Sequence, residues 1–245
     1  MKKRIFGLAV LALSMGLAQA SEGTHWGYVG EGAPEHWGEL APEFAACAKG
    51  QNQSPVNIEG EIKAAVPKLG FSYKTAATEL INNGHSIQAN FAPGSWMKLG
   101  GHEFELKQVH FHVPSENQIH GKAFAMEGHL VHQDKEGKLA VLAVMYKPGK
   151  AQGGINRIWK QMPEAAGDKH AFEGKLLASE LLPKQRDYYY FSGSLTTPPC
   201  SEGVAWVVLK HPVEASSEQF EQFAHAMHHP NNRPVQALNA RLVID

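Results

Sequence analysis

The sequence has little of several features that would assign a protein to a particular class. Among its 245 residues there are only two cysteines, Cys47 and Cys200. Two cysteines cannot complete a structural zinc site, which needs four protein ligands. After residue 20 no stretch approaches the ~20 apolar residues of a membrane-spanning helix. An internal repeat, a low-complexity block and a charged linker are also absent there, and we therefore predict one domain over residues 21–245.

Basic residues are not clustered after the first few positions. Without residues 1–20, which hold Lys2, Lys3 and Arg4, the chain has 20 Lys+Arg against 24 Asp+Glu, a formal charge of −4. Binding to nucleic acid or to anionic lipid through charge requires a basic patch. We therefore predict no nucleic-acid partner and, once residues 1–20 are removed, no membrane partner.

The first 20 residues have the layout of a cleavable secretory signal. The basic start is followed by an apolar run over 5–17 and by the small-residue pattern Ala18-Gln19-Ala20. An uncleaved anchor or an ordinary buried helix is the alternative. Export places the protein in the periplasm, where the two cysteines are expected to form one disulfide that closes a loop of roughly 150 residues. Two free buried thiols are the alternative to that bridge.

Short strand-like runs dominate the rest of the chain, and turn residues separate them. These runs cover 79–91, 96–113, 123–134, 139–147, 188–195 and 203–210. A helix is predicted from Ser216, which can form a capping box with Gln219, until Pro230 ends it. A second short helix is predicted over 153–162. The pattern indicates a mainly β (α+β) protein with a large, mostly antiparallel sheet and a few peripheral helices.

Two histidines lie two residues apart in the strand-like run "QVHFHV" (108–113). Alternate residues of a strand face the same side, so Gln108, His110 and His112 share one face. In "AMEGHLVH" (125–132) the same rule puts Glu127, His129 and Val131 on one face. If these strands are neighbours, about 4.8 Å apart, three imidazoles can converge on one point.

Three neutral imidazoles with one open position are typical of a catalytic zinc site. Gln108 and Glu127 each precede a histidine by two residues on the same face, where a group that holds the ring N–H must lie. From residue types alone, separately solvated histidines remain the alternative. The pair His225 and His229 is not predicted to bind metal, because Ala226 stands where a zinc protease needs its glutamate.

Collinear motifs over nearly the whole chain after residue 20 make the sequence similar to one known family. They are "HWGY" (25–28), "QSPVNI" (53–58), "NNGH" (82–85), "QVHFH" (108–112), "EGHLVH" (127–132), "LAVLAV" (139–144), "GSLTTPP" (193–199), "WVVLK" (206–210) and "NNRPVQ" (231–236). The chain resembles the α-class carbonic anhydrases, in particular the bacterial exported members. The resemblance implies a single domain with a twisted sheet of about ten strands.

The resemblance also implies one Zn²⁺ per chain on His110, His112 and His129. A zinc hydroxide would then attack carbon dioxide to give bicarbonate and a proton. Thr196 matches the threonine that accepts a hydrogen bond from the hydroxide, and Glu116 matches the glutamate that orients the threonine. The alternatives are a non-catalytic binding module on this fold and a zinc esterase or hydrolase with another substrate. The oligomeric state is not predicted from the sequence.

Further residues match the family's substrate and proton-transfer positions. The apolar wall beside the metal corresponds to Val131, Val141, Leu195, Val204 and Trp206, although such residues can also be simple core. Thr197 matches a contact to bicarbonate, and His85 matches the proton shuttle. The matches to residues that order the water chain are Tyr28, Asn83 and Gln88.

Other features of the family map onto this chain with two departures. Cys47 and Cys200 match the disulfide of exported members, and cis peptide bonds are expected at Ser54-Pro55 and Pro198-Pro199. Asn117 stands where a histidine is common among bacterial relatives. Gln88 replaces an asparagine found in many animal members, which could alter the water chain.

Overall fold

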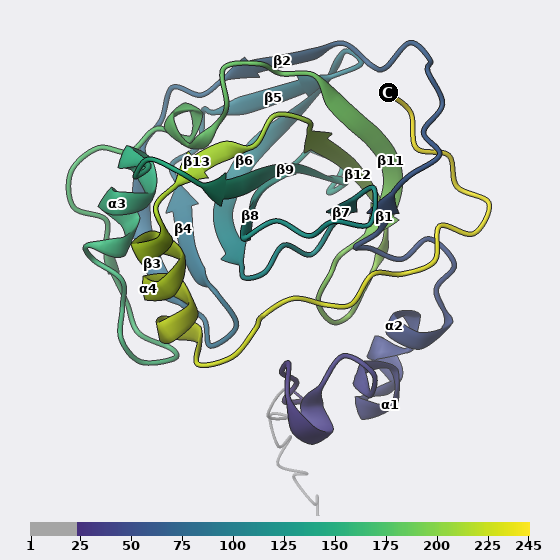
Figure 1. Cartoon of the computed structure of the whole chain (residues 1–245), viewed down its shortest axis with the longest axis horizontal. Coiled ribbons are helices and arrows are strands. Elements are labelled where there is room, and N and C mark those ends of the chain that lie inside the picture. The colour runs from purple at the N-terminus through teal and green to yellow at the C-terminus, as the bar shows by residue number, and fades with distance from the viewer. Residues whose placement is uncertain (1–23) are drawn as a thin grey trace, which may run out of the picture.

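An 11-stranded mixed sheet forms the body of the protein, as the computed structural model of residues 24–245 shows (Figure 1). The strand order along it is β10 (Lys169–Ala171), β3 (Ala77–Asn82), β4 (Ile87–Phe91), β6 (His102–His112), β8 (Met126–Gln133), β9 (Leu139–Pro148), β12 (Glu202–Leu209) and β11 (Tyr188–Ser194). Off this path, β2 (Leu69–Ser72) pairs with β5 (Trp96–Leu99), β5 pairs with β6, and β13 (Val213–Ala215) pairs with β9. Only β12–β9 and β13–β9 are parallel within this sheet. The predicted fold class is therefore confirmed.

The long central strands could be predicted because each has a long run of strand-forming residues. In β9 every residue from Ala140 to Tyr146 is buried, as expected for a strand that is covered on both faces. The short strands β2, β10 and β13 were not predicted, because three or four residues carry no readable period.

The predicted secretory signal, residues 1–20, lies outside the described residues. None of the helices in residues 24–245 has the length and apolar character needed to cross a membrane.

Two helices cover one face of the sheet, α3 (Gly153–Trp159) and α4 (Ser217–Met227). The predicted capping box is present: Gln219 N–H donates to Ser216 Oγ, and Ser216 N–H donates to Gln219 Oε1. α4 ends at Met227 because His228 adopts a left-handed conformation (φ 62°), three residues before the expected position. α3 also ends three residues earlier than predicted, at Trp159. The rings of Trp159 and Phe223 stack with centroids 5.1 Å apart, which joins the two helices.

The chain before the sheet consists of loops and short helices. It contains α1 (Trp37–Leu40), α2 (Ala46–Lys49) and single 3₁₀ turns at Gly30–Gly32 and Pro42–Phe44; a further 3₁₀ turn covers Ala178–Leu181. β1 (Asn57–Ile58) and β7 (Gln118–Ile119) form a separate two-stranded parallel sheet. Figure 1 shows α1 and α2 below the sheet, with the C-terminal segment passing between.

The predicted disulfide joins this N-terminal segment to the far end of the chain. Cys47 and Cys200 are bonded, with their Cα atoms 5.0 Å apart, so the alternative of two free thiols is wrong. Both expected cis peptide bonds, Ser54-Pro55 and Pro198-Pro199, are also present, together with a third at Val113-Pro114.

The two faces of the central strands carry different side chains. Residues directly opposite each other in neighbouring strands point to the same face, so the register of β6, β8, β9 and β12 defines each face. One face packs against α3 and α4; its members include Val109, Phe111, Leu130, Leu142, Val144 and Val207. The other face carries the three histidines.

His132 is a buried histidine on the helix-covered face and does not belong to that group of three. Its Nε2 lies 2.7 Å from the Tyr73 hydroxyl, and the side chain is fully buried. Burial lowers the pKa of His132 to about 4, although nearby backbone carbonyls act in the opposite direction. The folded protein therefore prefers the neutral ring, whereas the unfolded chain takes up a proton near pH 6.5.

This preference predicts acid-sensitive stability. Above pH 6.5 both states are neutral at this residue; between pH 6.5 and 4 the unfolded state binds more protons, so stability falls as pH falls. From the shift of pKa we expect His132 to account for a loss of about 3 kcal/mol over that range. Urea unfolding of wild type and His132→Gln at pH 7.5, 6 and 4.5 checks this. The variant should lose less stability than wild type on acidification, and exposed His102→Gln should follow wild type. Equal losses in wild type and His132→Gln would contradict the prediction.

Candidate metal centre

The register between β6 and β8 brings the three predicted histidines together. His110 lies directly opposite His129, and His112 lies opposite Glu127. The ring centroids of the three histidines are 4.6 to 5.2 Å apart. One nitrogen from each ring lies within 4.8 Å of the others, and in residues 24–245 this is the only such group of three potential ligands. His225 and His229 do not belong to it.

Each of these rings is fixed through its other nitrogen. Nδ1 of His110 donates to Oε1 of Gln108 (2.8 Å), and Nδ1 of His112 donates to the carbonyl of Asn231 (2.7 Å). Nε2 of His129 donates to Oε1 of Glu127 (2.9 Å). An oxygen acceptor requires the proton on the facing nitrogen, so the opposite nitrogen of a neutral ring carries a lone pair. The free atoms are therefore Nε2, Nε2 and Nδ1, respectively.

Burial keeps these imidazoles neutral. It is the largest cause that lowers the pKa of His110 and of His129 well below the ordinary value, and it also lowers the pKa of His112. A protonated imidazole cannot ligate a metal, so a depressed pKa keeps the ligand form populated at neutral pH. The three free nitrogens have the donor type and number of a catalytic zinc site.

Glu127 is itself held in place by a buried network. Its Oε2 accepts hydrogen bonds from the backbone N–H groups of Glu116 and Asn117, each at 2.8 Å. The side-chain amide nitrogen of Asn117 donates to Oε1 at 2.7 Å, and the side-chain oxygen Oδ1 of Asn117 accepts from Val56 N–H. Asn117, noted from the sequence only as a departure from relatives, thus positions the carboxylate that positions His129.

Glu116 lies between two of the histidines and is completely buried. Its Oε2 lies 3.5 Å from Nε2 of His112 and 3.9 Å from Nδ1 of His129. Neither Glu116 Oε2 nor His112 Nε2 has a hydrogen-bond partner. A buried acceptor without a donor is costly, and a cation beside His112 Nε2 would satisfy that nitrogen. This arrangement supports a metal at the free nitrogens.

Burial raises the pKa of Glu116 to about 8, while the Arg233 backbone N–H and the Thr196 hydroxyl lower it. Arg233 N–H donates to Glu116 Oε1 at 2.8 Å. Thr196 is also buried, with 6% of its surface exposed. The structure therefore places the predicted Thr196 and Glu116 side chains beside each other at the histidine cluster.

The motif "NNRPVQ" contains two residues whose place in the site was not predicted. Asn231 accepts from His112 through its carbonyl and donates from its amide to the carbonyls of His85 and Phe111, each at 2.9 Å. The buried guanidinium of Arg233 donates to Gln53 Oε1 and to the carbonyls of Ser54 and Cys47. The motif marked these positions, but only the three-dimensional contacts show what they hold.

The five predicted wall residues lie in one apolar cluster on the histidine face. Val131 is opposite Val141, and Val141 is opposite Trp206. Leu195 and Val204 belong to the same cluster. The Trp206 ring meets the His129 ring edge-on, with centroids 5.0 Å apart, so the cluster directly adjoins the candidate metal centre.

Two of these histidines line a small cavity. It has a volume of about 150 Å³ and is lined by Trp26, Tyr28, Asn83, His85, Ser86, Gln88, Gln108, His110, His112 and Thr197. The predicted proton shuttle His85 and the predicted water-ordering residues Tyr28, Asn83 and Gln88 therefore line the same cavity as Thr197. Asn83 Oδ1 accepts from the backbone N–H groups of His85 and Ser86, and its amide donates to Gln88 (3.4 Å).

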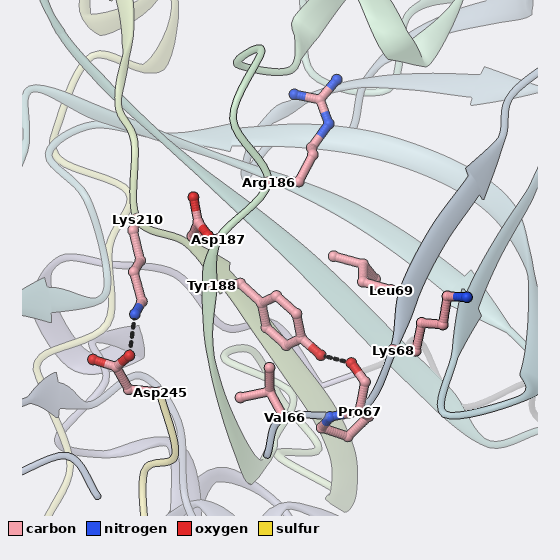
Figure 2. A pocket seen from close by; sticks show the side chains of 9 residues that line it. All are labelled: Val66, Pro67, Lys68, Leu69, Arg186, Asp187, Tyr188, Lys210 and Asp245. Carbon is pink, nitrogen blue, oxygen red and sulfur yellow. Dashed lines mark hydrogen bonds and ion pairs between the residues drawn. The ribbon is translucent and has the colours of Figure 1, made fainter. Parts of the chain in front are cut away.

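A larger hollow elsewhere in the molecule does not contain these groups. It has a volume of about 420 Å³ and is lined by Val66, Pro67, Lys68, Leu69, Arg186, Asp187, Tyr188, Lys210 and Asp245 (Figure 2). Lys210 pairs with Asp245, and the Tyr188 hydroxyl donates to the Pro67 carbonyl. This hollow has no histidine, and it is not the candidate metal centre.

Comparison with known proteins agrees with the site. The family model of the eukaryotic-type carbonic anhydrases matches residues 32–245. A carbonic anhydrase of Klebsiella pneumoniae is 48% identical over 100% of both chains, and one of Neisseria gonorrhoeae is 49% identical over 91% of this chain and 88% of its own. The solved α-carbonic anhydrase of Thermovibrio ammonificans, in complex with the inhibitor sulfanilamide, superposes with a TM-score of 0.89 at 47% identity, covering 91% of this chain and 100% of its own. The chain therefore belongs to the α-class, eukaryotic-type carbonic anhydrases, a family of zinc-dependent enzymes.

Proposed function

We propose that this carbonic anhydrase binds one Zn²⁺ through His110 Nε2, His112 Nε2 and His129 Nδ1 and uses it to hydrate carbon dioxide reversibly. The supporting observation is that each ring is fixed through one nitrogen while the other nitrogen is free and faces the same point. When bound, zinc lowers the pKa of a coordinated water to about 7 and so supplies a nucleophile at neutral pH.

Thr196 and Glu116 orient the attacking group in this proposal. A carboxylate accepts hydrogen bonds but cannot donate, so Glu116 would accept a hydrogen bond from the Thr196 hydroxyl and leave the hydroxyl oxygen free to accept a hydrogen bond on the side of the metal site. Although burial raises the pKa of Glu116, a dication held by the adjacent histidines favours its carboxylate form. Arg233 N–H fixes the other carboxylate oxygen.

The apolar cluster is the proposed site for carbon dioxide. This substrate is small and apolar, so the side chains of Val131, Val141, Leu195, Val204 and Trp206 can hold it beside the metal without hydrogen bonds. Thr197 lines the cavity and is the proposed contact for bicarbonate, which in contrast can form hydrogen bonds.

His85 is the proposed proton shuttle. It lines the same cavity as His110 and His112, and its ring stacks on Trp26 with centroids 3.7 Å apart. An imidazole can take and release a proton near neutral pH. Tyr28, Asn83 and Gln88 line the path between the metal centre and His85 and are proposed to order its water.

We also propose that the protein works in the periplasm after removal of residues 1–20, as a domain over 21–245. The disulfide between Cys47 and Cys200 fits an oxidising compartment. The basic and apolar layout of the first 20 residues fits a secretory signal.

The reaction can be tested by stopped-flow measurement of carbon dioxide hydration on the mature, zinc-loaded protein from pH 6 to 9. The proposal predicts a fast rate that rises through an apparent pKa near 7. No rate above that of buffer, with zinc confirmed as bound, would contradict it. That outcome would favour a binding module on the same fold or a zinc hydrolase with another substrate.

A further inference from the structure

His229 lies beside Tyr28, a residue that lines the small cavity of the candidate metal centre, and the proposed function gives it no role. α4 ends at Met227, and the left-handed conformation of His228 turns the chain. Two residues after His229, the Asn231 carbonyl accepts from His112 and the Asn231 amide donates to the carbonyl of His85. The segment that carries His229 is thus tied to both the metal-binding strand and the shuttle loop.

The ring of His229 and the ring of His85 both lie beside Tyr28. The centroid of the Tyr28 ring is 6.2 Å from that of His229 and 6.4 Å from that of His85. The Tyr28 hydroxyl is buried and has no hydrogen-bond partner. Two imidazoles therefore flank one cavity-lining phenol.

His229 has a nitrogen available to accept a proton. Its Nδ1 donates to the carbonyl of Pro230 at 3.0 Å, which places the lone pair of the neutral ring on Nε2. The side chain is half-buried, so Nε2 can exchange protons with solvent. A neutral imidazole with a free ring nitrogen can accept a proton there.

His229 and His85 also sense each other electrostatically. Burial is the main cause that lowers the pKa of His85, and positive charge on His25 and on His229 lowers it further. Such an interaction is mutual, so a proton on one ring favours release from the other. The titratable groups near His229 are His85, the phenol of Tyr28, and His228 beside it in the chain.

We propose that His229 is a second proton-transfer residue, working with His85 around the phenol of Tyr28. The inference rests on the proposed function, since it concerns the proton that hydration releases. One proton leaves the cavity, is held on Nε2 of His229, and passes to a buffer base in solution. The ring returns to its neutral form, so each cycle moves one proton and leaves the residue unchanged.

The test is His229→Gln in the zinc-loaded mature chain, because glutamine keeps a donor for the Pro230 carbonyl but cannot carry a proton. In dilute buffer we expect kcat for hydration to fall roughly 2- to 5-fold, below the range for losing a sole acid–base group because His85 still acts. The value of kcat/KM should not change, since it does not include the proton transfer to buffer. Added imidazole should restore kcat, and His229→Gln should lower the rate of His85→Ala further.

His225→Gln is the matched control, because His225 is an exposed histidine of α4 that lines a different hollow with Trp159 and Met162. It should behave as wild type. An unchanged kcat for His229→Gln in dilute buffer would overturn the inference, as would an equal fall of kcat and kcat/KM that imidazole does not restore. If wild type itself shows no hydration, the proposed function fails, and this inference fails with it. If wild type hydrates carbon dioxide rapidly and His229→Gln does so equally well, only the proposed role of His229 is contradicted.

Discussion

Replacing His129 with alanine is expected to remove zinc binding and carbon dioxide hydration together. Within residues 24–245, His129 supplies one of the three histidine nitrogens that converge at the candidate metal site. Two imidazoles cannot hold the ion as three do, and the Glu127 carboxylate behind the ring would lose the donor that it now accepts from. Without the ion there is no means of generating hydroxide at neutral pH.

Zinc content measured by mass spectrometry of the metal and the stopped-flow hydration rate check this prediction on the same sample. We expect zinc to fall from about one ion per chain to near zero and the rate to fall to that of buffer. His102→Ala is the matched control, because His102 is exposed and begins the strand that carries His110 and His112. Hydration that persists in His129→Ala without bound metal would show that the zinc mechanism is wrong.

Removing the disulfide is expected to have the largest effect on stability. The bridge joins residues 153 positions apart, and the entropy of closing so long a loop corresponds to about 5 kcal/mol of stabilisation before any strain. That amount is comparable to the whole free energy of unfolding of a typical domain, which is about 5–15 kcal/mol. The double variant Cys47→Ala/Cys200→Ala should therefore unfold at a much lower denaturant concentration.

The two bridged residues also form hydrogen bonds with residues near the candidate metal centre. Cys200 N–H donates to the carbonyl of Thr197 (2.8 Å), and the Cys47 carbonyl accepts from the guanidinium of Arg233. Guanidinium unfolding, followed by tryptophan fluorescence, measures the loss of stability. A reductant should shift the midpoint of wild type towards that of the double variant and leave the variant unchanged. Coincident unfolding curves for oxidised wild type and the double variant would refute the prediction.

The sequence alone was sufficient for the main architecture and for the candidate ligands. Period-two alternation in "QVHFHV" and "AMEGHLVH" assigned His110, His112 and His129 to strand faces, because backbone pleating fixes which residues share a side. Capping chemistry located the start of α4, since Ser216 and Gln219 satisfy each other's backbone N–H groups locally. Such features depend on neighbours in the chain, and so they are readable from it.

Helix ends and short strands were less predictable. Both helices stop three residues before the expected position, and β2, β10 and β13 had no readable pattern. These elements are decided by partners far along the chain: β10 pairs with β3 and β13 pairs with β9. A three-residue strand is stable only where another strand offers its backbone groups.

The sequence determined which side chains could bind a metal, whereas only the tertiary structure decided which nitrogen of each ring is free. That choice depends on acceptors far along the chain, such as the Asn231 carbonyl that holds His112 across 119 residues. The same is true of the burial that leaves Glu116 Oε2 and His112 Nε2 without hydrogen-bond partners, and of the positions of Asn117, Arg233 and His229 around the site. The alternation of residues along a strand predicts which side chains share a face. The hydrogen bonds and the desolvation of those side chains arise only when distant segments pack together.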